Sequence, residues 1–383
     1  MKFFPLSVLL ISILLAASCN GRKERLVVKS TVEKGEQITK AERLTIQQTD
    51  SFTKVTIINP WQGATNINQV YFLIKRGTSL PMGLDSSDVI FVPLKKIVCM
   101  STTHLAMISA LEEENSISGF SGTDLIYSDK LLGNVEKGLI GDVGYEAGLN
   151  NELILKISPD LIMMYGIGSE SISYANKVKE LGIKVMFDAD YLETNPLGKA
   201  EWLKLFGALY CRESLADSIF KAEVENYDKL KLYIIENISF KPKVLLGLPF
   251  KDTWYISPGN SYISNLITDA GGDYLWKNTE SPLSLPYGIE NVYLKALTAD
   301  YWLNIGSTKT KDEISIIDKR LSELPCFQVG NLYNNNRRIT KKGGNDYWES
   351  GSVYPHQILK DIASILHPDL FRDTVLYFYR KIY

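Results

Sequence analysis

The stretch from residue 213 to residue 237 constrains the fold most, because it contains neither glycine nor proline. Apolar residues recur along it at helical spacing, at Ile219, Ala222, Tyr227, Leu230 and Ile234. At about 1.5 Å per residue, such a helix is roughly 37 Å long. We therefore expect a rigid rod that joins two separate folding regions.

On both sides of this rod, short apolar runs alternate with helical stretches. Before it, strands are expected at Ile97–Met100, Ile117–Phe120, Leu161–Tyr165 and Lys184–Phe187, with helices over 103–114, 171–181 and 198–210. After it, strands are expected at Val244–Leu248, Trp254–Ser257, Tyr301–Ile305 and Gln328–Tyr333, with helices over 262–270, 290–296 and 356–366. This alternation predicts parallel strands connected by crossover helices.

A different pattern precedes these regions. Residues 42–50, 53–59 and 69–75 alternate polar with β-branched or aromatic residues, which predicts a short antiparallel meander. The segment Asn59-Pro60-Trp61-Gln62-Gly63 is typical of a turn or loop between two of these strands.

The chain begins with Met1-Lys2 and then an apolar run to Ala17. The run is shorter than the roughly 20 residues that a membrane-spanning helix needs, and it has the layout of a secretory signal. A small residue, Ser18, directly precedes Cys19, as in bacterial lipoprotein signals, although Leu15 lies one place further from the cysteine than usual. We expect cleavage before Cys19 and its acylation; the alternative is an ordinary signal peptide with an incidental cysteine.

These features predict the following division: signal peptide 1–18, lipid-anchored tether 19–40, N-terminal lobe 41–212 including the meander 42–75, connecting helix 213–237 and C-terminal lobe 238–383. The length supports two lobes, because a chain of 383 residues exceeds what one compact core usually takes.

Charge and cysteine content narrow the function. The net charge of −2 leaves no basic surplus for binding nucleic acid. Cys99, Cys211 and Cys326 remain besides Cys19, and their odd number and scattered spacing do not form a disulfide framework, although one bridge between two of them stays open. No metal-binding cysteine cluster is present.

Five segments carry a resemblance to one protein family. They are Val98-Cys99-Met100-Ser101-Thr102-Thr103-His104-Leu105, the run from Asn151 to Ile162 that contains Ser158-Pro159-Asp160-Leu161, Ser257-Pro258-Gly259-Asn260-Ser261-Tyr262-Ile263, Asp269-Ala270-Gly271-Gly272-Asp273 and Leu285-Pro286-Tyr287-Gly288-Ile289-Glu290. In this order, around one long helix, they resemble the class III substrate-binding proteins of ABC importers, the receptors for cobalamin, ferric siderophores and haem. The resemblance covers about residues 90–370, and the meander lies outside it.

The resemblance implies an α/β fold with two Rossmann-like lobes joined by one long backbone helix, here with an N-terminal antiparallel β extension. It also implies a monomeric, membrane-anchored periplasmic lipoprotein that binds a small molecule and delivers it to an ABC permease and its ATPase. Glu152 and Glu290 match the glutamates with which family members contact the permease, although both also suit the start of a helix.

Ligand contacts are expected just past strand ends, where open parallel sheets bind ligands. The candidates are Ser101, Thr102, His104, Tyr165, Asp188, Tyr191, Trp254, Tyr255, Tyr287 and Trp348. Because they are mostly neutral and aromatic, they suit cobalamin slightly better than haem or a ferric siderophore, and no cofactor or metal of the protein's own is expected. The sequence does not identify the ligand.

Two other functional classes have less support in the sequence. An α/β enzyme lacks support, because the sequence has no Gly-x-Ser-x-Gly elbow, no phosphate loop and no His-Glu-x-x-His helix. A cell-envelope scaffold lipoprotein has no need of a long inter-lobe helix or of paired glutamates at helix starts.

Overall fold

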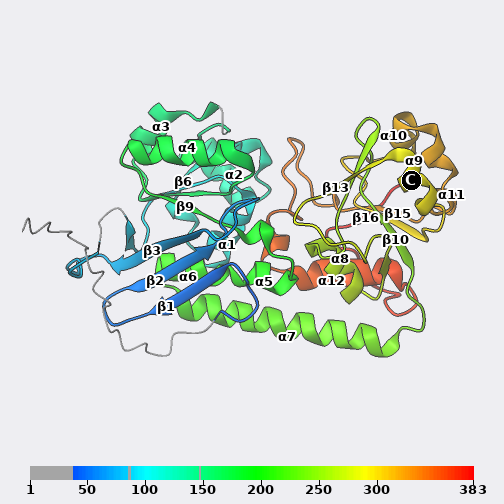
Figure 1. Cartoon of the computed structure of the whole chain (residues 1–383), viewed down its shortest axis with the longest axis horizontal. Helices are drawn as coiled ribbons and strands as arrows, with labels where there is room; N and C mark the ends of the chain where they lie inside the picture. The colour runs from blue at the N-terminus through cyan, green and yellow to red at the C-terminus, as the bar shows by residue number, and fades with distance from the viewer. Residues whose placement is uncertain (1–37, 85–87, 146–147) are drawn as a thin grey trace, which may run out of the picture.

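The computed structural model describes residues 38–383 apart from 85–87 and 146–147. The expected signal peptide 1–18, Cys19 and nearly all of the tether 19–40 lie outside the described residues. Figure 1 shows two α/β lobes side by side, with one long helix running beneath both. Of the helices in the described part of the chain, none combines the length and the apolar character that crossing a membrane requires.

The N-terminal lobe is built on a five-stranded sheet in which every neighbouring pair is parallel. Its strand order is β7-β6-β5-β8-β9, and the strands are β5 (Ile97–Cys99), β6 (Ile117–Phe120), β7 (Gly141–Asp142), β8 (Leu161–Met164) and β9 (Val185–Phe187). The helices are α1 (Thr102–Ala110), α2 (Asp129–Glu136), α3 (Asn151–Ile157), α4 (Gly168–Glu180), α5 (Pro196–Glu201) and α6 (Leu203–Tyr210). The expected parallel pairing is confirmed.

Side chains of β5 are buried on both faces of this sheet. Ile97 and Cys99 pack in the cluster formed with α1 and α6, whereas Val98 packs in the cluster formed with α3 and α4. Successive residues of a strand point to opposite faces, so an uninterrupted apolar run marks a strand that helices cover on both sides.

The C-terminal lobe repeats this plan. Its five-stranded sheet has the order β12-β10-β14-β15-β16, from β10 (Lys243–Leu246), β12 (Asp273–Tyr274), β14 (Tyr301–Leu303), β15 (Leu332–Asn334) and β16 (Arg380–Lys381), with only β16 antiparallel to its neighbour. A separate antiparallel pair joins β11 (Thr253–Ile256) and β13 (Leu285–Gly288). The helices are α8 (Tyr262–Asp269), α9 (Ile289–Ala296), α10 (Lys311–Ile317), α11 (Pro325–Gln328) and α12 (Pro355–Leu366).

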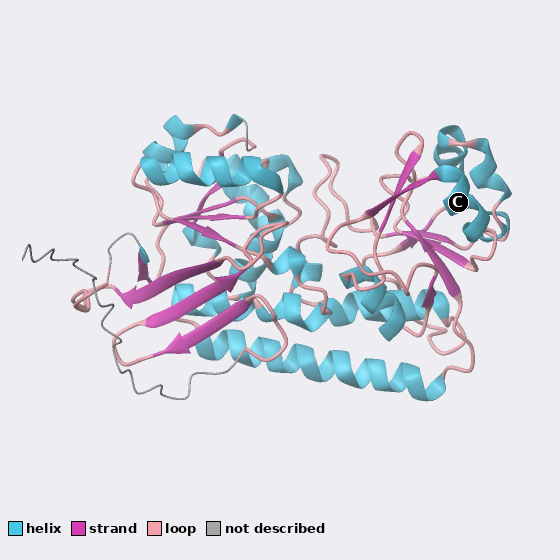
Figure 2. Ribbon diagram, viewed as in Figure 1, coloured by secondary structure: helices cyan, strands magenta, loops and turns pink. Residues whose placement is uncertain are grey.

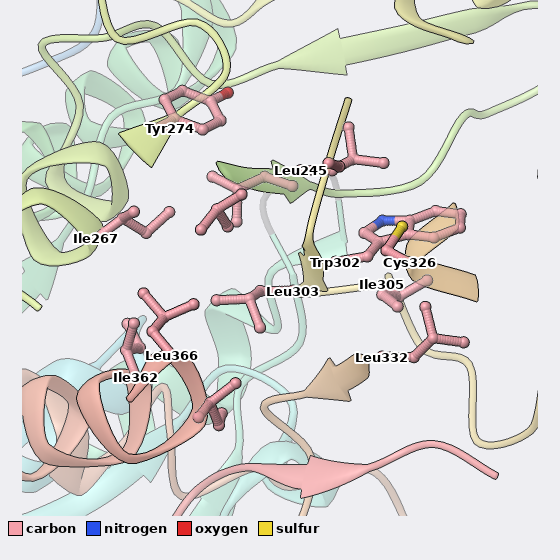
Figure 3. Close-up of a cluster of buried hydrophobic side chains, with 14 of the residues drawn as sticks. Leu245, Ile267, Tyr274, Trp302, Leu303, Ile305, Cys326, Leu332, Ile362 and Leu366 are labelled. Carbon is pink, nitrogen blue, oxygen red and sulfur yellow. The ribbon is translucent and has the colours of Figure 1, made fainter. Parts of the chain in front are cut away.

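The core of this lobe lies between its sheet and α12. In Figure 3, Leu303 from β14 lies near Ile362 and Leu366 from α12, and all three side chains are buried. Trp302 lies on the other side of β14, near Cys326 and Leu332.

Helix α7 (Glu213–Asn237) occupies the residues expected for the rod and runs along both lobes (Figure 2). It packs against α6 of the N-terminal lobe and α12 of the C-terminal lobe. Inward-facing polar groups fix it in place: Glu223 accepts hydrogen bonds from the backbone N–H and ring of His356 at 2.7 and 2.5 Å, and the Tyr227 hydroxyl donates to Asp269 at 2.7 Å. One continuous helix thus sets the relative position of the lobes.

The N-terminal extension is the expected antiparallel meander with one more strand. Strands β1 (Leu44–Gln48), β2 (Thr53–Ile58) and β3 (Asn68–Lys75) pair antiparallel, and β4 (Val89–Val92) then pairs parallel with β3. Figure 1 shows this sheet lying against the N-terminal lobe.

Several expected elements have different bounds, and three of them have a physical reason that the structure shows. The helix expected over 103–114 ends at Ala110, and Glu112 beyond it has a positive φ of 61°, which a continuing helix does not allow. The helix expected over 198–210 is divided into α5 and α6 at Trp202. Within the strand expected over 328–333, Gln328 is helical and strand β15 begins at Leu332.

Candidate functional site

A cavity of about 1030 Å³ lies between the two lobes. In the C-terminal lobe it borders Leu246 and Gly247, at the end of β10, and Asn304, just after β14. In the N-terminal lobe it borders Tyr191, in the 3₁₀ turn that follows β9. The cavity therefore lies at the carboxyl ends of strands from both lobes, which is where open α/β sheets bind ligands. Its volume is at the upper end of the range for small-molecule pockets, about 300–1,000 Å³.

Three of the ten predicted ligand contacts line this cavity: Tyr191, Tyr255 and Trp348. The Tyr255 and Trp348 side chains are 57% and 55% exposed, so each has free surface for a ligand. Tyr191 is held from behind, because its hydroxyl donates to the Gly166 carbonyl and accepts from the Gln62 N–H at 3.2 Å. Both lobes thus contribute an aromatic wall.

Three other predicted contacts, His104, Asp188 and Trp254, do not line this cavity, because their side chains are completely buried. His104 Nε2 lies 3.5 Å from a carboxylate oxygen of Asp188 inside the N-terminal lobe. Burial lowers the pKa of His104 to about 3 and raises the pKa of Asp188 well above its usual value. Trp254 donates its indole N–H to the Leu246 carbonyl at 3.0 Å within the C-terminal core.

The other four predicted contacts also lie off the cavity. Ser101 caps helix α1 by accepting from the Thr103 N–H at 3.3 Å, and the Thr102 hydroxyl donates to the Trp348 carbonyl at 3.1 Å. Tyr165 packs edge-on behind Tyr191, and the Tyr287 ring lies 6.4 Å from that of Trp276. Of these four residues, Thr102 and Tyr165 contact residues that line the cavity, Trp348 and Tyr191.

The segment 338–349 of the C-terminal lobe reaches across to the N-terminal lobe. Glu349 is 5% exposed, and its carboxylate accepts the N–H groups of Tyr127 and Ser128 at 2.8 and 3.1 Å. Lys342 pairs with Asp124 at 2.8 Å, and the Arg338 guanidinium lies 5.0 Å from the centre of the Tyr127 ring. The same segment also meets the start of α1, where the Thr102 hydroxyl donates to the Trp348 carbonyl.

Lys199 brings a positive charge to the cavity wall. Its ammonium nitrogen lies 3.6 Å from an Asp190 carboxylate oxygen and 5.5 Å from the ring centre of Tyr262 in the opposite lobe. The charge is therefore balanced by Asp190 and placed over an aromatic face, which favours a cation. A ligand with an anionic edge can meet this partly compensated cation, and Arg43 also lines the cavity.

Several lining residues were not anticipated from the sequence. They include Trp61, Gln62, Thr65, Lys199 and Tyr262. Tyr262 belongs to the quoted motif Ser257–Ile263, so its place in a motif was a usable signal. Trp61 had only a turn pattern to mark it, and nothing in that pattern points to a cavity.

Glu152 and Glu290 are exposed residues in the first turns of α3 and α9. Figure 1 places both helices on the side of the molecule opposite α7, one on each lobe. The Glu290 carboxylate is 69% exposed and lies 3.3 Å from Arg320. Among the residues that the structure describes, no cluster of three or more His, Cys, Asp or Glu is arranged to hold a metal ion.

Two curated relatives of the chain are lipoproteins by name. An uncharacterised lipoprotein of Methanocaldococcus jannaschii is 29% identical over 306 residues, which cover 78% of this chain and 71% of that protein. A second uncharacterised lipoprotein of the same organism is 27% identical over 326 residues, covering 81% and 79%. No protein-family model matches the chain.

Solved structures with the same fold are periplasmic binding proteins. A periplasmic binding protein from Veillonella parvula has a TM-score of 0.56 at 12% identity and covers 80% of this chain and 97% of its own. A periplasmic heme-binding protein from Pseudomonas aeruginosa has a TM-score of 0.55 at 15% identity and covers 72% and 93%. At these identities the likeness concerns the fold, and at that level the resemblance inferred from the five motifs is confirmed.

Proposed function

We propose that this chain, which has the two-lobed fold of the periplasmic solute-binding proteins, is the substrate-binding lipoprotein of an ABC importer. The observation that carries the proposal is the cavity of about 1030 Å³ between the lobes, with aromatic residues of both lobes in its walls. A cavity of this size and character suits a bulky, partly aromatic ligand that both lobes grip together.

The ligand class follows from the walls. Tyr191, Tyr255 and Trp348 offer flat apolar faces with polar tips, and two cations line the cavity, Lys199 near Asp190 and Arg43. None of the described residues that line the cavity is histidine, cysteine or methionine. We propose a corrinoid or an iron complex such as haem or a ferric siderophore, held by its periphery, and we place the corrinoid first because the walls are mostly neutral.

Export and anchoring complete the proposal. Acylation of Cys19 would hold the protein at the membrane, and the chain between it and residue 38 would let the lobes approach a permease. A tethered receptor is present at a higher effective concentration near its partner than a free one. In this scheme Glu152 and Glu290 contact the permease, whose ATPase drives release and transport, and the receptor acts as a monomer.

A ligand panel tests the binding function. The full-length chain, purified in detergent, is heated alone and with cyanocobalamin, haemin or a ferric hydroxamate. A ligand that binds only the folded state adds about 2.7 kcal/mol to stability at 100 times its Kd, so one of the three is expected to raise the unfolding temperature clearly. Absence of a shift with all three, and of any visible absorbance in the purified protein, would contradict the proposal.

A further inference from the structure

Two segments of the N-terminal extension reach the cavity, although the extension lies outside the region that resembles the binding-protein family. One is Glu42–Arg43, just before β1, and the other is the loop Trp61–Thr65 between β2 and β3. The extension is therefore placed to do more than space the lobes from a membrane.

The first segment is fixed to the lobe by two buried carboxylates. Glu201 is completely buried and accepts the N–H groups of Thr39, Lys40 and Ala41 at 2.9, 2.6 and 2.9 Å. Its neighbour in the fold, Glu193, is 2% exposed and accepts the N–H groups of Glu42 and Arg43 at 3.0 Å each.

These contacts are costly to break. Burial raises the pKa of Glu193, and a buried carboxylate that loses its donors is strongly unfavourable. The backbone of residues 39–43 is thus a required partner of the N-terminal lobe.

The second segment is fixed at the ends of the lobe's own strands. Gln62 donates its N–H at 2.9 Å to the carbonyl of Gly166, which lies two residues beyond β8. The Trp61 ring packs edge-on against the Phe187 ring of β9, with 5.4 Å between the ring centres. A Cβ atom on Gly166 would lie 2.4 Å from the Cβ of Trp61, so the loop and the strand end approach as closely as a glycine permits. The loop therefore lies where a sheet of this type presents its ligand contacts.

We infer that the loop Trp61–Thr65 of the N-terminal extension is a specificity-determining wall of the ligand cavity. The inference rests on the proposed binding function and adds to it a part of the site that the common two-lobed fold does not supply. Because the loop is anchored on both the strand ends and Tyr191, it is preformed, and its side chains limit which bulky ligands fit.

Bulky substitutions test the wall. Ala64→Trp and Thr65→Trp add volume at two cavity-lining positions, and Ser51→Trp adds the same volume at an exposed turn of the same extension, away from the cavity. The Kd values for cyanocobalamin, haemin and a ferric hydroxamate are measured by fluorescence quenching with full-length chains. At least one wall variant is expected to lose tenfold or more in affinity for the ligand that the unmodified chain binds best, while Ser51→Trp stays within twofold.

The outcomes separate the two claims. If the unmodified chain binds a ligand, and both wall variants have the same Kd values as Ser51→Trp for every ligand, the inference is overturned and the proposed function is kept. If the unmodified chain binds none of the three ligands, the proposed function falls and the inference falls with it. The unfolding temperature of each variant is also measured without ligand. A loss of affinity supports the inference only where the variant unfolds at the same temperature as Ser51→Trp.

Discussion

Glu349 shows how one buried carboxylate ties the lobes together. It belongs to the C-terminal lobe, yet its two carboxylate oxygens accept hydrogen bonds from two backbone N–H groups of the N-terminal lobe. Burial raises its pKa to about 7, and the nearby Asp346 carboxylate adds to the rise. Asp346 is itself paired with Arg338 at 2.5 Å, so the charges facing Glu349 are one carboxylate and the cation that partly offsets it.

The raised pKa predicts a pH-dependent stability. Because the folded chain holds the Glu349 proton more tightly than the unfolded chain, whose value is near 4.5, this group stabilises the fold fully below pH 4.5 and loses that contribution as the pH rises to about 7. In the Glu349→Gln variant this side chain stays uncharged. Between pH 5 and 8 the unfolding free energy of the variant should therefore fall less than that of the unmodified chain, and the difference is on the order of 3 kcal/mol at most.

Urea unfolding at pH 5, 6, 7 and 8 measures this difference. Glu236→Gln, which removes an exposed carboxylate of α7, is the matched control and should follow the unmodified chain at each pH. Parallel pH curves for the Glu349→Gln variant and the unmodified chain would show that the carboxylate ionises normally.

At this scale the sequence predicted the cavity only in part. Tyr191, four residues after β9, lines the cavity, as do Tyr255 and Trp348, whereas Asp188 directly follows β9 and is buried, as is His104 in α1. A position after a strand end does not decide what covers it. Thr102 is covered by a segment 246 residues away in the chain, and no local pattern carries that information.

The long helix is the element that the sequence predicted best. Its bounds agree with the expected range because helix continuity depends on local properties, chiefly the absence of glycine and proline. Bounds that depend on tertiary contacts were less accurate. The division of 198–210 at Trp202 is an example, since the buried indole N–H of Trp202 donates to Glu193 at 3.1 Å, and Glu193 in turn fixes the extension.

Continuity of α7 predicts a large effect of proline. Glu225 is exposed near the middle of the helix, so Glu225→Pro removes no buried side chain but deletes a backbone donor and places the ring against the preceding turn. Such a change costs about 3 kcal/mol or more in a helix interior. The unfolding temperature, followed by circular dichroism, should fall strongly for Glu225→Pro and change little for Glu225→Ala. Equal unfolding temperatures would mean that the lobes hold together without a continuous α7.

At the scale of the whole molecule, α7 and the two helices that carry Glu152 and Glu290 lie on opposite edges. Helix α7 runs along one edge, and α3 and α9 lie on the other edge with Glu152 and Glu290 in their first turns (Figure 1). The Glu290–Arg320 pair is exposed, and such surface pairs contribute about 0–1 kcal/mol, so Glu290 is free to exchange Arg320 for a cation of another protein. The placement of one carboxylate on each lobe supports a partner that spans both.

The docking proposal predicts a separation of binding from transport. The double substitution Glu152→Ala with Glu290→Ala should leave the ligand Kd within twofold, because both residues lie away from the cavity, and should reduce ligand uptake at least tenfold in cells that carry the cognate permease. Glu136→Ala with Glu236→Ala removes two exposed glutamates from α2 and α7 and should leave both measurements unchanged. Normal uptake by the first double variant would remove Glu152 and Glu290 from the docking surface. A matching loss of ligand affinity would instead assign them to the binding site, since a contact made only with the permease cannot weaken the complex between receptor and ligand.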